Sequence, residues 1–454
     1  MKATVIGGGL AGCEAAWQLA NRNVQVTLYE MKRVTKTPAQ SLDTMAELVC
    51  SNSLRSDRLT NAVGLLKEEM RRLDSIILQT ADATKVPAGG ALAVDREHFS
   101  AEIERTITGH PNIAVVQREI TDIPQGDTII ATGPLTSDAL SDAIVKMNGL
   151  STLHFYDAAA PIVTAESLDM DKAFVMSRYG RGEDYLNCPL DKEEYEAFVY
   201  ALQTADTVPV KGFEEKAVFE GCMPIESLAK RGDQAIAFGP LKPVGLSDPR
   251  TGRRPYAVVQ LRQDNFAASL YNMVGFQTRL TFLEQRRVFR MIPGLENAEF
   301  ARMGVMHRNT FLNSPGFLDD TYRVINRPQL YFAGQMTGVE GYVESAASGL
   351  LAGLSMAYRL HGAEPPHFSG KTAIGAMGRY VSSPNKRFQP MNCAFGLIDS
   401  LDYDPGEKKI RNKAERYQKI AERALAEVET VRRQMEQDDW TGKPIGDTIA
   451  ENKE

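Results

Sequence analysis

The sequence predicts a mixed α/β fold in which a nucleotide-binding domain is interrupted by an insertion. Near the start, an apolar run at 3–6 leads into a glycine-rich turn, a helical pattern and a second apolar run. From 329 onward, the same order of strand, glycine turn and helix returns. This alternation is typical of parallel sheets that are covered by helices.

The length and a change in composition predict how the chain is divided. At 454 residues it is too long for one hydrophobic core of ordinary size. Aromatic residues, proline and glycine become frequent after about residue 150. The predicted parts are a first part of the nucleotide-binding domain at 1–150, a mixed α/β insertion at 151–325, the second part of the nucleotide-binding domain at 326–400, and a C-terminal helix at 401–454.

The glycine-rich turn GGGLAG is the first candidate site. Gly7 permits a tight turn, Gly9 lets the backbone approach a pyrophosphate, and Gly12 lets helix and strand pack closely. Glu30 ends the next strand, where a carboxylate can bind a ribose hydroxyl. This combination predicts a Rossmann-like dinucleotide site. The residues expected to contact the dinucleotide are Gly7, Gly8, Gly9, Leu10, Ala11, Gly12 and Glu30.

Further elements are predicted from apolar spacing. VGLLKEEMRRLDSIIL reads as a helix, NIAVVQREI and DTIIATGP as strands, and DKEEYEAFVYALQTA as a helix with acidic residues in its first turn. Apolar residues in 410–435 recur in alternating steps of four and three. We interpret this segment as a helix docked on its own domain rather than as an inter-subunit coil, because alanines fill several of the apolar positions.

Charge and hydropathy limit the classes of function. A net charge of −6 excludes nucleic-acid binding by overall charge, so RNA would need a local basic patch. The turn SDPRTGRRP offers Arg250, Arg253 and Arg254 as candidate phosphate contacts, although such turns are more often simply solvated. The sequence contains no apolar run of membrane-spanning length and no signal-peptide pattern, so we expect neither.

The five cysteines are scattered and form no C-x-x-C pair, which favours a reducing cytoplasm and argues against disulfides or a zinc site. Cys50 precedes the turn-forming residues Ser-Asn-Ser, and Cys222 lies between Gly221 and Pro224. Both are candidate reactive thiols. Cys13, Cys188 and Cys393 are expected to be buried and inert.

Several longer motifs point to a known family. DTIIATG and LYFAGQMTGVEGYVESAASG resemble the cofactor-contacting segments of two-dinucleotide-fold flavoproteins. Together with AELVCSNSLRS, PAGGALAVDRE, FEGCMPIE, FGPLKPVGL and MHRNTFLNSP, they are similar to the bacterial folate- and FAD-dependent tRNA uracil-5-methyltransferases over nearly the whole chain. The tRNA wobble-uridine modification flavoproteins share the glycine turn but are much longer.

This resemblance implies FAD as cofactor, methylenetetrahydrofolate as carbon donor and NAD(P)H as reductant. It implies that Cys222 attacks uracil C6 and that Cys50 assists at C5 or on the flavin side, and the two assignments could be exchanged. Gly334, Gln335, Gly341 and Tyr342 are expected at the flavin end.

The implied substrate is a T-loop uridine of tRNA, with no obligate protein partner. Two alternatives stay open, namely the same chemistry on ribosomal RNA and a flavoprotein oxidoreductase without RNA chemistry. The chain departs from the family pattern at Gln40, where members carry a histidine.

Overall fold

A computed structural model describes residues 1–37, 39–148, 153–209, 223–385, 388–403, 409–438 and 440. Its first sheet has six strands in the order β16-β17-β7-β1-β2-β6, and all neighbours are parallel except β16 and β17. The carboxyl ends of its parallel strands therefore share one edge, where ligands bind in open α/β sheets. The strands are β1 (Lys2–Ile6), β2 (Gln25–Glu30), β6 (Ile113–Gln117), β7 (Thr128–Ile130), β16 (Arg323–Val324) and β17 (Arg327–Phe332).

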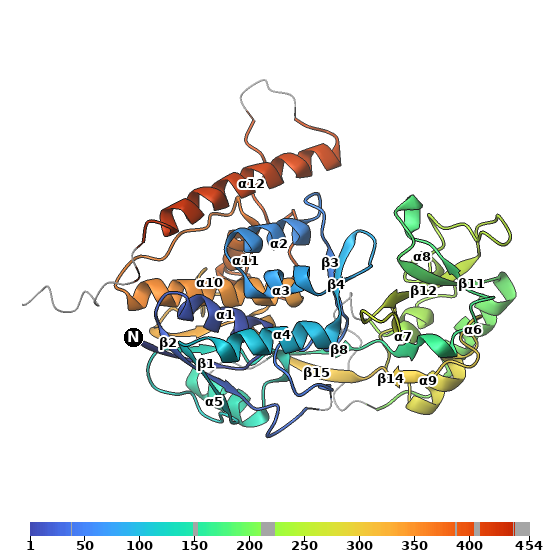
Figure 1. Ribbon diagram of the computed structural model, residues 1–454, viewed down its shortest axis with the longest axis horizontal. Helices are drawn as coiled ribbons and strands as arrows, with labels where there is room; N and C mark the ends of the chain where they lie inside the picture. Colours follow the sequence, from blue (N-terminus) through green and yellow to red (C-terminus); the bar gives the residue numbers. More distant parts are fainter. Residues whose placement is uncertain are drawn as a thin grey trace, which may run out of the picture.

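Two helices far apart in sequence pack against each other in this domain (Figure 1). They are α1 (Leu10–Ala20) and α10 (Tyr342–Leu360). A Cβ on Gly349 would lie 2.1 Å from the Ala11 carbonyl oxygen, and one on Gly353 would lie 2.7 Å from that of Ala15. Glycine at these positions therefore lets the two helix backbones touch. The other helices are α2 (Ala62–Arg72), α3 (Ile76–Ala83), α4 (Arg96–Gly109), α5 (Asp138–Asn148) and α11 (Ala373–Ser382).

The single helix predicted from VGLLKEEMRRLDSIIL is wrong, because the structure has α2 and α3 with a break between them. Asp74 in the break has a φ of 56°, which ends the first helix. Ser75 then caps the second, its Oγ accepting the Leu78 N–H at 3.3 Å. Apolar spacing continues across the break, so the pattern alone could not reveal it.

The insertion contains its own hydrophobic core and an antiparallel sheet in the order β10-β11-β12-β13-β9-β14. Its helix α6 begins with a capping box, in which Asp191 and Glu194 each accept the other's backbone N–H. The elements are β9 (Ile162–Thr164), β10 (Phe174–Val175), β11 (Tyr185–Leu190), α6 (Lys192–Thr204), α7 (Ile225–Lys230), α8 (Ala235–Phe238), β12 (Ala257–Gln263), β13 (Leu270–Met273), α9 (Phe282–Phe289) and β14 (Phe300–Arg302).

An antiparallel ribbon of β8 (Leu153–Ala158) and β15 (Met306–Phe311) lies between the two domains (Figure 1). β16 pairs with β17 in the first sheet, although it lies within the predicted 151–325 insertion. A small sheet of β3 (Ser53–Ser56), β5 (Ala91–Val94) and β4 (Lys85–Val86) extends from the nucleotide-binding domain.

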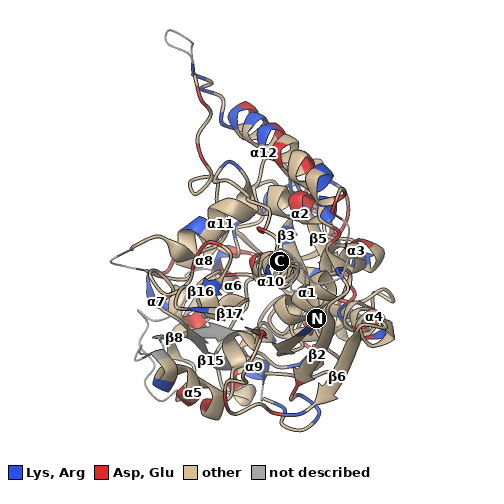
Figure 2. Cartoon of the chain, turned by 90° about the vertical axis from the view of Figure 1, so that its left-hand side faces the viewer, with Lys and Arg blue, Asp and Glu red and all other residues tan. Residues whose placement is uncertain are grey.

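The C-terminal helix α12 (Lys413–Met435) packs on α2 of the same chain. Ala421, Ala424 and Val428 are buried, and an Arg72 guanidinium nitrogen donates to the Leu425 carbonyl at 3.1 Å. Basic residues (blue) and acidic residues (red) are interspersed along its length (Figure 2). Among the helices described, none is both long enough and apolar enough to cross a membrane.

Candidate active site

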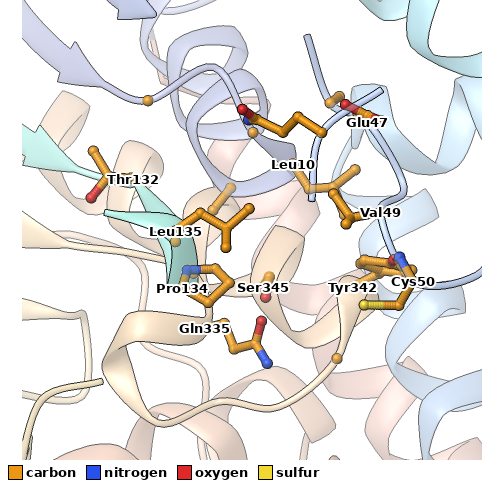
Figure 3. Close-up of a pocket in the computed structure, with 18 of the residues that line it drawn as sticks. Leu10, Glu47, Val49, Cys50, Thr132, Pro134, Leu135, Gln335, Tyr342 and Ser345 are labelled. Atoms are coloured by element: carbon orange, nitrogen blue, oxygen red, sulfur yellow. The ribbon is translucent and has the colours of Figure 1, made fainter. Parts of the chain in front are cut away.

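A cavity of about 460 Å³ opens at the carboxyl edge of the first sheet, within the size range of small-molecule sites. Segments from the first and second parts of the nucleotide-binding domain line it (Figure 3). Residues of the insertion, among them Arg262 and Asn272, line it as well. The predicted cofactor residues that line it are Gly7, Gly8, Gly9, Leu10, Ala11, Glu30, Gly334, Gln335, Gly341 and Tyr342. The segment Thr132–Leu135, which follows β7, lines it as well.

Each glycine of the turn has a different environment. A Cβ on Gly12, the predicted contact that does not line the cavity, would lie 1.8 Å from the Gly7 carbonyl oxygen, so helix and turn are in direct contact there. Gly7 has a φ of 100°, which other residues rarely adopt. Gly9 has no atom within 4 Å of its Cβ position. The backbone at Gly9 therefore faces open space that a ligand can fill.

Glu30 is fixed by the turn that it faces. One carboxylate oxygen accepts the Gly8 N–H at 2.6 Å, and the other accepts the Lys32 N–H at 2.8 Å. The carboxylate is 7% exposed at the end of β2. It is thereby held beside the cavity, where it can accept hydrogen bonds from ribose hydroxyls.

Two helix N-termini open onto the cavity. Gly9 precedes α1 and Gly341 precedes α10, and neither helix has a side-chain cap. Uncapped N–H groups and the helix dipole favour a negatively charged ligand. The residues present thus fit a dinucleotide cofactor such as FAD, whose pyrophosphate such N–H groups would bind.

The loop that carries Cys50 is joined to α10 through Tyr342. The Tyr342 hydroxyl accepts the N–H groups of Cys50 at 2.7 Å and of Ser51 at 3.3 Å. Burial, and secondly the nearby Cys50, raise the pKa of Tyr342 well above its usual value, so the hydroxyl keeps its proton. Figure 3 shows the half-buried Cys50 next to Tyr342 at the cavity wall.

Three arginines from separate elements surround this loop. Arg96 donates to the Leu48 carbonyl at 2.5 Å and pairs with Asp264 at 2.9 Å. Arg262 donates to Asn52 at 3.0 Å and to the Ser51 hydroxyl at 2.8 Å. Arg302 interacts electrostatically with Cys50, as Arg96 does. Guanidinium groups thus lie around the loop, and that of Arg96 is paired with the Asp264 carboxylate.

A buried ion pair holds the segment at 40–47, which precedes the cysteine loop. The buried Lys32 and Glu47 form an ion pair at 3.0 Å, and Glu47 also accepts the Ser41 hydroxyl at 2.7 Å. Gln40 lines the cavity, and its side-chain oxygen accepts the Thr37 N–H at 3.0 Å. The position at which the resemblance implies a histidine in place of Gln40 is thus part of the cavity wall.

Cys13, Cys188 and Cys393 are buried outside the cavity lining. Burial raises the pKa of Cys188 to about 12 and those of Cys13 and Cys393 further above the usual value. These thiols stay protonated at neutral pH and are poor nucleophiles.

The predicted nucleophile Cys222 lies outside the described residues. Among the described residues, the predicted RNA contacts Arg250, Arg253 and Arg254 do not line the cavity. The Arg250 guanidinium is engaged by Asp248 at 2.8 Å and by the Asp171 carbonyl, so it stabilises its own turn, while Arg253 and Arg254 are exposed. Within the described ranges, no group of three potential ligands could hold a metal ion.

Comparison with known proteins shows to which family the chain is related. A family model described as glucose inhibited division protein A matches residues 2–364. Methylenetetrahydrofolate--tRNA-(uracil-5-)-methyltransferase TrmFO of Enterococcus faecalis is 61% identical over 93% of this chain and 97% of its own length. The protein of the same name from Bacillus subtilis is 58% identical over 94% of this chain and 98% of its own.

The chain belongs to the folate- and FAD-dependent tRNA (uracil-5-)-methyltransferase family. The predicted family is thereby confirmed. Among solved structures, GidA of Aquifex aeolicus aligns with a TM-score of 0.66 and 17% identity, covering 96% of this chain and 76% of its own. That likeness confirms the predicted fold class, a Rossmann-like domain of the flavoprotein type with an insertion.

Sequence reasoning missed the arginines around the cysteine loop of this family member. Arg96 is the arginine of the motif PAGGALAVDRE, and Arg262 lies in the segment QLRQ. Nothing in their spacing connected them with Cys50, because α4 and β12 meet the loop only in the folded chain.

Proposed function

We propose that this protein uses methylenetetrahydrofolate and FAD to methylate C5 of a T-loop uridine in tRNA, in the cytoplasm. The observation that carries the proposal is a dinucleotide cradle whose wall includes a thiol, Cys50, held among three arginines. The family membership and the names of the relatives support the reaction class.

The turn Gly7–Gly12, Glu30 and the segment Gly334–Tyr342 would hold FAD. When bound, FAD supplies electrons that reduce the transferred carbon to a methyl group, and we propose NAD(P)H as their source. The α10 N-terminus favours negative charge at this end of the cavity. Arg96 and Arg302 add to the same field.

Uracil C5 is a poor nucleophile until a thiolate adds at C6. We assign that addition to Cys222, which makes C5 enolate-like and able to attack the methylene carbon of the folate. The C5 proton must then be removed, and the thiolate must leave C6. We assign the flavin-side or C5 role to Cys50, because Tyr342 and the arginines fix its loop at the cavity wall.

The deciding experiment incubates the protein with labelled methylenetetrahydrofolate, NAD(P)H and either an unmodified tRNA transcript or a ribosomal RNA fragment. We expect labelled 5-methyluridine in tRNA alone. Label in ribosomal RNA alone would show that the substrate is ribosomal RNA instead of tRNA. The absence of label from both RNAs, with full FAD content, would reject the RNA chemistry.

A second experiment tests the cradle. Gly9→Val should fold, because no atom lies within 4 Å of the Cβ position, but its side chain would occupy the space over the pyrophosphate. We expect colourless protein with a melting temperature close to that of flavin-free wild type. Retention of full flavin absorbance by Gly9→Val would contradict the assignment.

A further inference from the structure

Tyr179 is an exposed aromatic residue in a strained backbone conformation. It lies in the short 3₁₀ turn Arg178–Gly180, has a φ of 63° and leaves 58% of its surface exposed. The left-handed conformation is unfavourable for a tyrosine, and an exposed ring gains little from burial. Folding alone therefore gives little reason for a tyrosine here.

The surrounding loops hold Tyr179 in place. Its N–H donates to the Gly245 carbonyl at 2.9 Å, and a Cβ on Gly245 would lie 2.8 Å from the ring. Arg178 donates to the carbonyl of Lys242 at 2.6 Å and to that of Val244 at 2.8 Å. The position of the ring on the surface is thus fixed by the protein before any ligand binds.

Basic and apolar groups accompany the ring. The Arg181 guanidinium lies 5.2 Å from the ring centroid, and Lys242 is exposed on the adjoining loop. Val244 is 39% exposed beside it. We call Tyr179, Arg181, Lys242 and Val244 the Tyr179 surface.

This surface adjoins the cavity through two routes. Pro240, on the same loop as Lys242, packs against Gly275, which lines the cavity. On the other side, Arg178, next to Tyr179, donates to the Gln260 side-chain oxygen at 2.8 Å, and Gln260 lies on β12, the strand that carries the cavity-lining Arg262. The Tyr179 surface and the cavity wall are thus connected through the loop that carries Pro240 and through β12.

We propose that the Tyr179 surface binds RNA next to the target uridine, with the Tyr179 ring stacked on an unpaired base and Arg181 and Lys242 contacting phosphates. The inference rests on the proposed function and adds the place where the RNA loop is held. Loops of RNA are recognised by stacking of unpaired bases on aromatic rings, aided by arginine and lysine. The surface combines these groups, whereas Arg250 is engaged by Asp248.

The test measures binding of unmodified tRNA by FAD-loaded protein and methylation in parallel. Tyr179→Ala should weaken binding and raise KM by about 10- to 100-fold, while kcat at saturating tRNA and FAD content stay unchanged. Tyr200→Ala is the matched control, because Tyr200 is 68% exposed on α6 of the same domain. Binding by Tyr179→Ala equal to that of wild type would overturn the inference.

Two further variants separate stacking from a structural role. Tyr179→Phe should bind like wild type, whereas Tyr179→Gly should bind as weakly as Tyr179→Ala despite relieving the positive φ. Wild-type binding by Tyr179→Gly, or loss of FAD with the loss of binding, would overturn the inference.

Salt dependence separates phosphate contacts from stacking. Arg181→Ala and Lys242→Ala should each lower the slope of log K against log salt by about 1, and Tyr179→Ala should leave it unchanged. Unchanged slopes in both basic variants would reject the phosphate contacts. Because binding is measured without turnover, failed methylation by wild type would count against the proposed function alone.

Discussion

Two cysteines lie near the first turn of α10, and their surroundings are opposite. Tyr342 accepts the backbone N–H of Cys50, and Glu344 accepts that of Cys393 at 2.8 Å. Cys50 is half-buried at the cavity wall near Arg96 and Arg302. Cys393 is buried, and its nearest charges include the carboxylates of Glu344 and Glu69. The comparison predicts that access and the sign of neighbouring charges, rather than proximity to a helix N-terminus, decide which thiol reacts.

The largest expected effect comes from removing each thiol in turn. Cys50→Ala should lower methylation by more than about 10³-fold with FAD still bound, since the chemistry needs a second thiol. Cys393→Ala should keep wild-type kcat and change the melting temperature slightly. Equal activities of the two variants would contradict the proposed difference between a reactive Cys50 and an inert Cys393.

The charge near Cys50 can be removed on its own. Arg96→Met leaves Asp264 buried without its partner and should cost about 3–5 kcal/mol of unfolding free energy. The double variant Arg96→Met with Asp264→Leu should recover most of that stability. Both proteins are compared in a Cys222→Ala background. There, Cys50 of the double variant should react with iodoacetamide more slowly at neutral pH than Cys50 with Arg96 and Asp264 in place. An unchanged rate in the stable double variant would show that the Arg96–Asp264 pair does not activate the thiol.

Glu69, one of the carboxylates near Cys393, predicts that the free energy of unfolding depends on pH. Burial raises the pKa of Glu69 to about 8, although its carboxylate accepts the N–H groups of Ala373 and Ile374 at 2.8 and 2.9 Å. Because the pKa is higher in the folded protein than in the unfolded chain, the contribution of the protonated Glu69 to the free energy of unfolding is fully present below about pH 4.5. It is lost as pH rises through 8. Between pH 5 and 8, wild type should lose about 3 kcal/mol relative to Glu69→Gln in denaturant titrations. Parallel curves for the two proteins would contradict the assignment.

The smallest effect sharpens the comparison at Tyr342. Tyr342→Phe removes the acceptor of two backbone N–H groups, which should cost about 1–3 kcal/mol of unfolding free energy. Because Glu344 holds the Cys393 segment, hydrogen exchange should accelerate at Cys50 and Ser51 and stay unchanged at Cys393. Faster exchange at both cysteines would mean that α10 itself had loosened.

Local patterns in the sequence were enough to predict the cradle. A glycine turn, the preceding strand and Glu30 lie within thirty residues, so their spacing alone implies their geometry. The distant segment Gly334–Tyr342 was found by resemblance to flavoproteins. Both line one cavity in the structure.

What could not be predicted depends on long-range packing. Arg96, Arg262 and Arg302 come from α4, β12 and β14, and no periodicity relates them. The break at Asp74 was hidden because a positive φ leaves no mark in apolar spacing. Tyr342 is predicted at the flavin end, but the sequence does not reveal that its hydroxyl accepts hydrogen bonds from a loop 292 residues away.

The place of β17 in the first sheet bears on how the chain folds as it is synthesised. β7 pairs with β1 on one side and with β17 on the other, and roughly 200 residues separate β7 from β17. At ordinary rates of translation, the emerging sheet keeps an unpaired edge at β7 for about 10–40 seconds, while the insertion, with its own core, can fold first. The α1 surface that α10 later covers is exposed for the same interval. A ribosome-bound chain that ends before α10 therefore lacks one wall of the cradle, and cofactor capture must follow the synthesis of α10.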